Sequence, residues 1–324
     1  MTLAYLKGSP AILDSRFPLP LDVPFSTAQA LAEGVTRDQL LRLCRLGLLR
    51  RPVKGAYVAA QVPDSRELRG RVVSLVAPPG SVLADWSATW YWTGLDRPGT
   101  QFECPPLTVL RFRGHERLRN GLVKSGQRWF RPGDVVPIDD RISVSTPIRT
   151  AWDLGRFSPR IIAIGGMDAL CRRGSFEVAE LVDGVERFRR QRGVVQLRRI
   201  APLVDPRAES SGESALRLRW LETPGMPPPE LQIVVVRSGG RGVFRLDLGL
   251  EELRFGAEYD GHEWHSSPED LDHDERRRNE LEEHGWCIVV FRRENVYGQL
   301  EDATARLVQA LAEARRTFYM RTLR

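Results

Sequence analysis

The chain of 324 residues has few cysteines and lacks the long apolar runs of membrane proteins. Its four cysteines are scattered singly, without a CxxC pair, which argues against a disulfide framework and against a cysteine zinc site. No apolar run approaches the roughly 18 residues that span a bilayer. The N-terminal segment also lacks the apolar stretch of a signal peptide. We therefore expect a soluble cytoplasmic protein with no membrane partner.

The composition is that of a globular protein with several cores. Hydrophobic residues make up 42% of the chain and charged residues 28%. At about 100–200 residues per domain, this length predicts two or three domains. Pro, Ser and Gly interrupt the pattern at 62–65 and again at 203–212. We therefore predict domains at 1–61, 62–205 and 206–324, and an α+β multidomain fold.

The charge is distributed unevenly around a net value of +6. Arg37–Lys54 holds six Lys or Arg against one acid, Arg111–Arg131 seven against one, and Arg187–Arg199 six against none. A single cluster of this kind is commonly a solvated helix face. Three such clusters favour a polyanionic partner, because Lys and Arg provide phosphate contacts.

An acidic block follows the basic clusters. Asp247–Gly285 contains fourteen Asp or Glu against four Arg. Carboxylates do not contact phosphate directly without cations. The block is therefore a first indication of a metal site.

The first predicted domain has two short helices and a basic hairpin. A helix over TAQALAEG is capped by Ser26-Thr27 and stops at Gly34, and a second, RDQLLRLCRLG, follows Thr36 and stops at Gly47. The segment LLRRPVKGAYVAA then reads as two extended runs around a turn at Pro52–Gly55. This order is the plan of a winged helix-turn-helix. The alternative is a small helical domain that uses the same plan for protein contacts.

A winged helix would place the second helix in the major groove of double-stranded DNA and its hairpin on phosphate. The predicted contacts from the helix are Thr36, Arg37, Gln39, Arg42 and Arg45, and those from the wing are Arg50, Arg51 and Lys54.

The first domain also resembles a known family. The segment STAQALAEGVTRDQLLRLCRLGLLRRPVKGAYV, within roughly residues 24–60, is similar to the N-terminal winged-helix domain of AbiEi-type antitoxins. These antitoxins are transcriptional regulators of bacterial abortive-infection systems. The phrase STPIRTAWDLGR (Ser145–Arg156) looks like the region that often follows this domain. The resemblance implies DNA binding by the first domain.

The middle segment contains no catalytic constellation. We predict helices at Val72–Ala77 and Val82–Leu95, and strands at Pro105–Arg113 and Ile142–Ser145. Its aromatic cluster around Trp90 is typical of a core rather than of a base-stacking platform. A connecting α/β domain with basic surfaces is expected.

The third segment has a clear order of elements. We predict a helix at Glu213–Leu221, strands at Leu231–Val236, Val243–Leu250 and Arg254–Asp260, a helix at Pro268–His284, a strand at Trp286–Phe291, and a final helix at about 299–316. The order α-β-β-β-α-β, with a meander followed by a crossover helix, matches the core of the PD-(D/E)XK nuclease fold.

Carboxylates fall where such chemistry requires them. Asp247 lies within an otherwise apolar strand, where a buried charge is costly unless it is paired or binds a cation. Glu258 and Asp260 are two residues apart and so share one face of a strand. Glu213 on the preceding helix can reach the same place. These oxygens suit Mg²⁺ or Mn²⁺, which would polarise a scissile phosphate.

Histidines are concentrated beside this cluster. His265 is the candidate general base, because a neutral imidazole can accept a proton from an attacking water. Asp274 on the following helix can orient the imidazole. Two alternatives remain open for His262 and His265, namely a surface loop and zinc ligation.

The third segment resembles the very-short-patch repair (Vsr) endonucleases and their relatives over roughly residues 210–295. The matching features are a glutamate that opens the first helix (Glu213), a strand aspartate (Asp247), the loop Gly261-His262-Glu263-Trp264-His265, an aspartate before an Arg-rich helix (Asp274), and Leu281–Trp286. The resemblance implies a nicking nuclease in which Asp247 binds the metal, His265 is the base, and the backbone carbonyl near Tyr259 completes the metal shell.

The chain departs from this pattern at several points. Where the wider superfamily has a lysine two residues after the acid, and the repair enzymes a histidine, this chain has Asp260. The histidine-rich tail and structural zinc ligands are not evident. Mismatch recognition is therefore not expected. The leading hypothesis is a DNA-binding, metal-dependent endonuclease, acting in phage defence or DNA repair. The alternative is a DNA-binding regulator or antitoxin with an inert nuclease-like domain.

Overall fold

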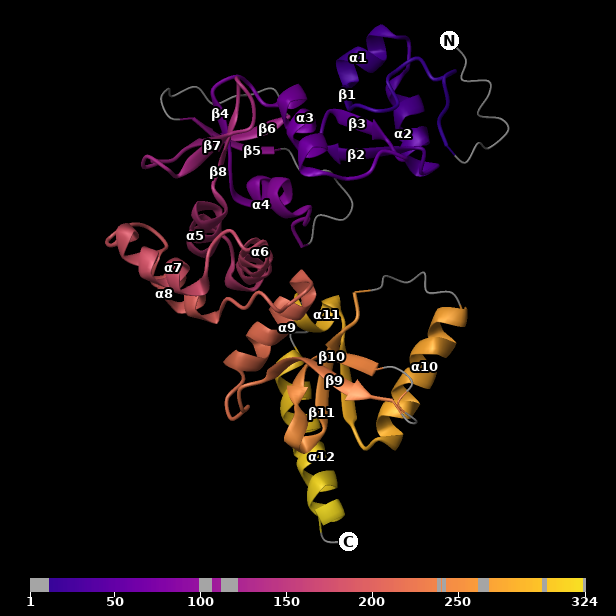
Figure 1. Cartoon of the computed structure of the whole chain (residues 1–324), viewed down its shortest axis with the longest axis vertical. Coiled ribbons are helices and arrows are strands. Elements are labelled where there is room, and N and C mark those ends of the chain that lie inside the picture. The colour runs from indigo at the N-terminus through magenta and orange to yellow at the C-terminus, as the bar shows by residue number, and fades with distance from the viewer. Residues whose placement is uncertain are drawn as a thin grey trace. The chain divides into compact units, whose positions relative to one another are not determined.

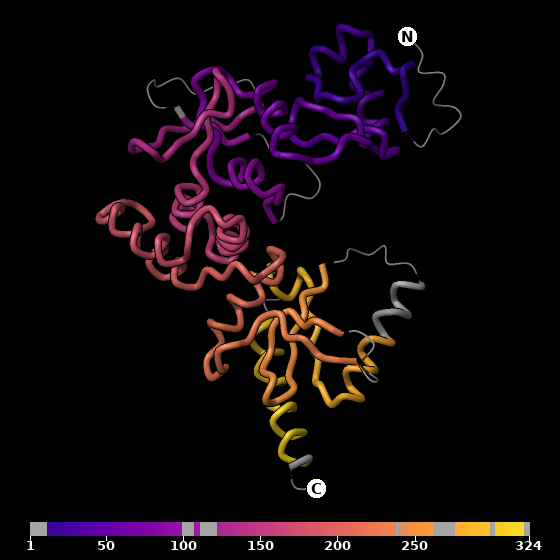
Figure 2. Tube along the Cα trace, viewed as in Figure 1, coloured from indigo at the N-terminus to yellow at the C-terminus, as the bar shows by residue number. Residues whose placement is uncertain are grey.

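The protein is a mixed α/β chain with three separate sheets among the described residues (Figure 1). The computed structural model describes residues 12–98, 107–111, 122–237, 240, 243–261, 268–298 and 302–322. Its Cα path, followed by residue number in Figure 2, divides into two compact units, Met1–Leu154 and Gly155–Arg324. Within the described ranges, no helix is long and apolar enough to cross a membrane.

The predicted domain boundaries differ from this division. The boundary at 61/62 lies inside the first unit, and the boundary at 205/206 lies inside the second. Helix α5 (Pro147–Phe157) contains the division between the units. The three-domain organisation stays a prediction.

The first unit begins with the two expected helices and the hairpin. Strand β1 (Phe25–Ser26) leads into α1 (Thr27–Ala32), α2 (Arg37–Arg45), β2 (Leu49–Val53) and β3 (Ala56–Ala59). The three strands form a sheet of order β1-β3-β2. Gly34 and Gly47 follow the two helices with φ of +78° and +69°, a conformation that glycine adopts without a steric cost. The predicted helices and hairpin are confirmed as elements.

A five-stranded sheet follows in the same unit. Helix α3 (Arg66–Val76), β4 (Ser81–Leu83), α4 (Asp85–Thr93), β5 (Leu107–Arg111), β6 (Val123–Gln127), β7 (Val135–Pro137) and β8 (Ser143–Ser145) give the strand order β6-β5-β4-β8-β7. The prediction of one helix over Val82–Leu95 is wrong. Val82 and Leu83 lie in β4, which pairs with β5 and β8, and the helix begins only at Asp85.

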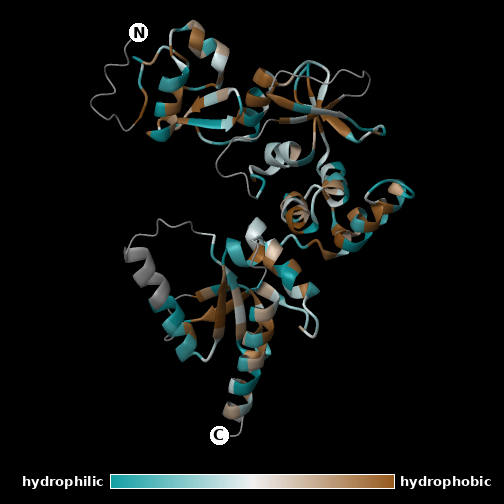
Figure 3. Cartoon of the chain, turned by 180° about the vertical axis from the view of Figure 1, so that it is seen from behind, coloured by the Kyte–Doolittle hydropathy of each residue, from teal (hydrophilic) through white to brown (hydrophobic). Residues whose placement is uncertain are grey.

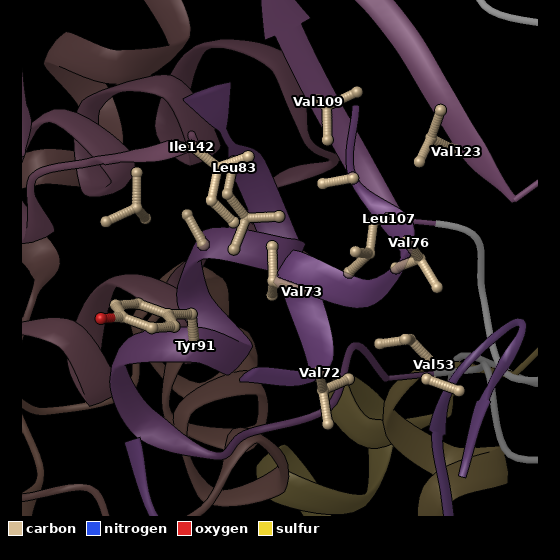
Figure 4. Close-up of a cluster of buried hydrophobic side chains, with 14 residues drawn as sticks. Val53, Val72, Val73, Val76, Leu83, Tyr91, Leu107, Val109, Val123 and Ile142 are labelled. Carbon is tan, nitrogen blue, oxygen red and sulfur yellow. The ribbon is translucent and has the colours of Figure 1, made fainter. Parts of the chain in front are cut away.

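One core joins the hairpin to this sheet (Figure 4). Val53 of the hairpin packs in the same buried cluster as Val72 and Val76 of α3 and Leu107 of β5. The hairpin therefore packs part of its buried face against α3 and the sheet region.

The second unit starts with a group of helical segments. They are α6 (Arg160–Arg172), α7 (Val178–Asp183), the 3-10 segment Gly184–Phe188, and α8 (Val194–Ile200). Helix α9 (Ser211–Glu222) packs closely against α6. Between them, buried Arg217 donates to buried Asp168 at 2.8 Å. This pair ties the helices to the sheet region that follows.

The sheet of the second unit has the order β12-β11-β10-β9. Its strands are β9 (Glu230–Val236), β10 (Val243–Leu250), β11 (Phe255–Tyr259) and β12 (Cys287–Phe291), and its helices are α9, α10 (Pro268–Glu283), α11 (Arg293–Val296) and α12 (Ala303–Thr322). The first three strands are antiparallel, and β12 returns parallel to β11 after α10. The predicted order of elements is confirmed. Hydrophobic residues are concentrated on these strands, whereas the described side chains of α10 are mostly hydrophilic (Figure 3).

Candidate functional site

Asp247 lies at an interruption in the sheet of the second unit. Pairing between β10 and β11 ends at Leu248, and pairing between β10 and β9 passes from Leu246 to Leu248 without Asp247. The two halves of β10 also pack differently. Phe244 and Leu246 contact the cluster around Leu281 of α10, whereas Leu248 belongs to the cluster under α9 and α12. Asp247 therefore sits, half-buried, between two cores.

The Asp247 carboxylate has one backbone donor. Its Oδ2 accepts from the backbone N–H of Tyr259 at 2.8 Å. Burial raises the pKa of Asp247 to about 7, and this hydrogen bond opposes the shift. The charges of Glu213 and Glu258 raise the pKa of Asp247 further, while Arg277 lowers it. Asp247 therefore feels the charges of both Glu213 and Glu258, and the predicted convergence of these carboxylates on a metal ion stays a prediction.

Glu213 is placed by the first turn of α9. Its backbone N–H donates to the Oγ of Ser210, which caps the helix. Its Oε2 accepts from the backbone of Glu209 at 2.9 Å and from the Nε2 of Gln232 at 3.0 Å. The helix start therefore orients this carboxylate toward β9 and β10.

Glu258 has a strong partner that the sequence analysis did not foresee. Both Nη atoms of Arg277 on α10 donate to its two carboxylate oxygens, one of them at 2.8 Å. Such a bidentate pair is among the stronger ionic contacts in proteins. The Glu258 carboxylate is consequently neutralised by the protein itself.

Tyr259 is held against the start of α9. A Cβ at Gly212 would overlap the Tyr259 ring, so only glycine permits this approach. The ring of Tyr297 lies edge-on to it at 6.4 Å, and the Tyr297 hydroxyl donates to the Ser211 carbonyl at 2.7 Å. These contacts fix the β11 end of the site relative to α9.

Asp260 follows the end of β11, at the position where the wider nuclease superfamily has lysine. Its Oδ2 accepts from the Nε of Arg292 at 3.2 Å. His265 lies outside the described residues. Asp274 lies in α10, but its side chain is likewise outside the described part. Among the described side chains, no group of three or more His, Cys, Asp or Glu is arranged to hold a metal ion.

In the first unit, two of the predicted DNA contacts serve the helix start. The Thr36 Oγ1 accepts from the backbone of Gln39 at 3.2 Å, and the Gln39 Oε1 accepts from the backbone of Thr36 at 2.8 Å. This is a capping box, which stabilises the N-terminus of α2. Both side chains therefore have a structural role at the place where base contacts were expected.

The basic residues of the same region fall into two groups. Arg37, Arg42 and Arg45 on α2 are exposed, and Lys54 is exposed at the hairpin turn. Arg50 and Arg51 are half-buried: Arg50 donates to the carbonyl of Val62, and the Arg51 guanidinium lies 5.8 Å from the centre of the Tyr57 ring. Of the predicted cationic contacts, these four exposed side chains face solvent.

Gln232 and Arg277 were both missed as site residues. Gln232 lies in a run of apolar, mostly β-branched residues that predicts an ordinary strand. Its positive φ cannot be recognised from the sequence. Arg277 is one of three consecutive arginines, and helical spacing alone does not tell which one meets the sheet. The signal available for Arg277 was the excess of acid around it.

No family model matches the chain. Fold and site define a two-unit mixed α/β protein with a half-buried aspartate, Asp247, in its C-terminal sheet. The chain is 34% identical over 287 residues to two proteins of Mycobacterium tuberculosis, each described as uncharacterized, MT2308 of strain CDC 1551 / Oshkosh and Rv2248 of strain H37Rv. The match covers 87% of this chain and 99% of either relative. The chain belongs to the family of these two proteins.

Among solved structures, the chain is similar to the RV2827C protein from Mycobacterium tuberculosis. The sequence identity is 19%, the TM-score is 0.27, and the match covers 56% of this chain and 73% of the other. A likeness this slight carries no argument about function.

Proposed function

We propose that the protein is a DNA-binding, metal-dependent endonuclease that nicks double-stranded DNA. The observation that carries the proposal is Asp247, a half-buried carboxylate whose pKa is raised by burial and by two neighbouring carboxylates. A cluster of this kind is costly to keep in a fold unless a ligand compensates it. The α-β-β-β-α-β order of elements around it supports a PD-(D/E)XK-type core.

The donor types suit an oxygen-preferring divalent ion, although the described side chains form no ready-made group around one. Asp247, Glu258 and the Tyr259 carbonyl would hold Mg²⁺ or Mn²⁺, and Glu213 would lie beside them. Glu258 can join only if its ion pair with Arg277 opens. When bound, such an ion polarises a phosphate and lowers the pKa of a coordinated water.

Proton transfer and DNA binding would be carried out by side chains of the protein. His265 would accept a proton from the attacking water, and Asp274 would orient its imidazole. Asp260 stands where the wider superfamily has lysine, and an ionised carboxylate cannot donate a hydrogen bond to the phosphate. In this structure Asp260 is bound by Arg292. The exposed cations Arg37, Arg42, Arg45 and Lys54 would bring duplex DNA to the first unit in a winged-helix manner.

A plasmid assay tests the proposal. Purified full-length protein with Mg²⁺ or Mn²⁺ should convert supercoiled plasmid to relaxed circles, and EDTA should prevent this. Asp247→Asn should be inactive, while Glu252→Gln, which changes an exposed carboxylate of the same unit, should retain activity. Equal cleavage by the Asp247→Asn protein would refute the assigned site.

The Glu258–Arg277 pair favours a second candidate function. Arg277 provides the positive charge that a metal ion would otherwise bring to Glu258, so the chain would then be a DNA-binding regulator or antitoxin with an inert nuclease-like domain. Duplex binding in a gel shift, without cleavage under any metal condition, would favour this second function.

A further inference from the structure

Gln232 has an unusual backbone conformation at the centre of the proposed site. It lies within strand β9 with φ of +57°, a region that residues other than glycine rarely adopt. The register is the same on both sides of it, with Leu231 opposite Leu248 and Ile233 opposite Leu246. The break in pairing is therefore confined to Gln232 and the residue opposite it, which is Asp247.

The side chain of Gln232 is anchored on one side only. Its Nε2 donates to the Glu213 carboxylate at 3.0 Å. A carboxylate can only accept, so this contact fixes which end of the amide is nitrogen. The Oε1 is then directed elsewhere, and it is buried without a hydrogen-bond partner among the described residues.

Both features cost free energy. A buried amide oxygen without a donor loses the hydrogen bond that it makes to water in the unfolded chain. A positive φ at glutamine adds backbone strain, and strained residues persist where the surroundings or a function retain them. Gln232 lies opposite Asp247 in the register and its Nε2 binds the Glu213 carboxylate, so the side chain lies in a region of negative charge.

We propose that Gln232 is a positioning residue and a neutral oxygen donor of the metal site. This inference rests on the proposed function. The amide nitrogen holds Glu213, and the amide oxygen accepts Mg²⁺ or Mn²⁺, directly or through a water of the ion. Both ions bind oxygen donors, among which amide oxygens add no charge. A neutral donor suits this position, since a further carboxylate would repel Glu213 and Asp247 when the ion is absent.

Calorimetric titration of the full-length protein with Mn²⁺ at pH 8 tests this role without measuring cleavage. Gln232→Gly removes the amide and is suited to φ of +57°, so the backbone conformation of β9 is retained. We expect Mn²⁺ affinity to fall by about 10-fold or more, as it does when supporting residues of metal sites are removed. Gln232→Glu keeps an oxygen and should bind Mn²⁺ more tightly than Gln232→Gly.

A second readout separates metal binding from a merely structural role. The increase in melting temperature caused by saturating Mn²⁺ should be larger for Gln232→Glu than for the wild type, because the ion relieves the added repulsion. Gln309→Glu, an exposed change on α12, should behave as the wild type. A folded Gln232→Gly protein that binds Mn²⁺ as tightly as the wild type would overturn this inference but not the proposed function. A wild-type protein that does not bind Mn²⁺ would overturn the metal site of the proposed function and this inference with it.

Discussion

At the scale of single residues, Asp247 makes the stability of the protein depend on pH. Its carboxyl has a pKa of about 7 in the folded chain, against 3.8 as the ordinary value, so folding favours its protonated form. Without metal, this contribution is fully present at pH below about 3.8. It is lost as pH rises toward 7, because the folded state must then hold a buried charge.

Asp247→Asn should remove this dependence. In urea unfolding with EDTA, the wild type should lose roughly 2 kcal/mol more stability than the variant between pH 5 and pH 8. Saturating Mn²⁺ at pH 8 should restore stability to the wild type only. The same pH dependence in both proteins would contradict the assignment of this pKa.

For His265, the prediction separates a loss of cleavage rate from a loss of metal affinity. If it is the general base, His265→Ala should reduce the cleavage rate roughly 10²–10⁴-fold while Mn²⁺ affinity stays the same, because only proton transfer is lost. Asp274→Asn should show a weaker rate defect, since it disturbs only the orientation of the imidazole. A parallel fall in metal affinity would instead make His265 a ligand. Single-turnover rates and calorimetry together decide between them.

Of the residues at this site, Asp247 can be predicted from the sequence, whereas Gln232 and Arg277 cannot. Asp247 stands out because a charge inside an apolar alternation needs a compensating partner. Gln232 does not, since a polar residue in a strand is ordinary on a solvent-facing side and its backbone angle is set by tertiary contacts. Arg277 meets Glu258 only through the crossover of α10, and the sequence does not specify that register.

At the scale of elements, helix α2 and the hairpin make a prediction about salt. Changing Arg42, Arg45 and Lys54 together to Ala should weaken duplex binding and reduce the slope of log K against log salt by about 0.9 for each lost phosphate contact. The matched control changes Arg71, Lys124 and Arg141, which are exposed in the same unit. Gel shifts at several salt concentrations measure the slope. An equal effect of both triple variants would indicate nonspecific charge attraction.

Helices and strands could be predicted where the hydrophobic periodicity ends at residues that interrupt secondary structure. The run Val243–Leu250 alternates and is bounded by glycines and acids, and β10 has these bounds. Val82 and Leu83 were misassigned because a three-residue apolar strand beside a helix has no periodicity of its own. Its pairing with β5 and β8, both distant in sequence, decides its conformation.

At the scale of the whole molecule, the two units predict which fragments fold. A fragment of residues 155–324 retains the packing of α6 on α9 and the buried pair between Asp168 and Arg217. A fragment of 206–324 loses both. We expect cooperative urea unfolding for the longer fragment and markedly lower stability for the shorter one. Equal stability of the two would support the domain boundary predicted at 205/206.

The buried contact between Asp168 and Arg217 also has a consequence for how the family diversifies. Loss of either partner leaves a charge without compensation inside the protein, whereas replacement of both by apolar residues is tolerated far better. We therefore expect substitutions at these two positions to occur in pairs, although 49 residues separate them along the chain. Alignments of the family should show correlated changes at these positions, and recombination between them should be selected against. Because of this coupling, we expect helix α6 and the region from α9 onward to be exchanged between relatives as one piece.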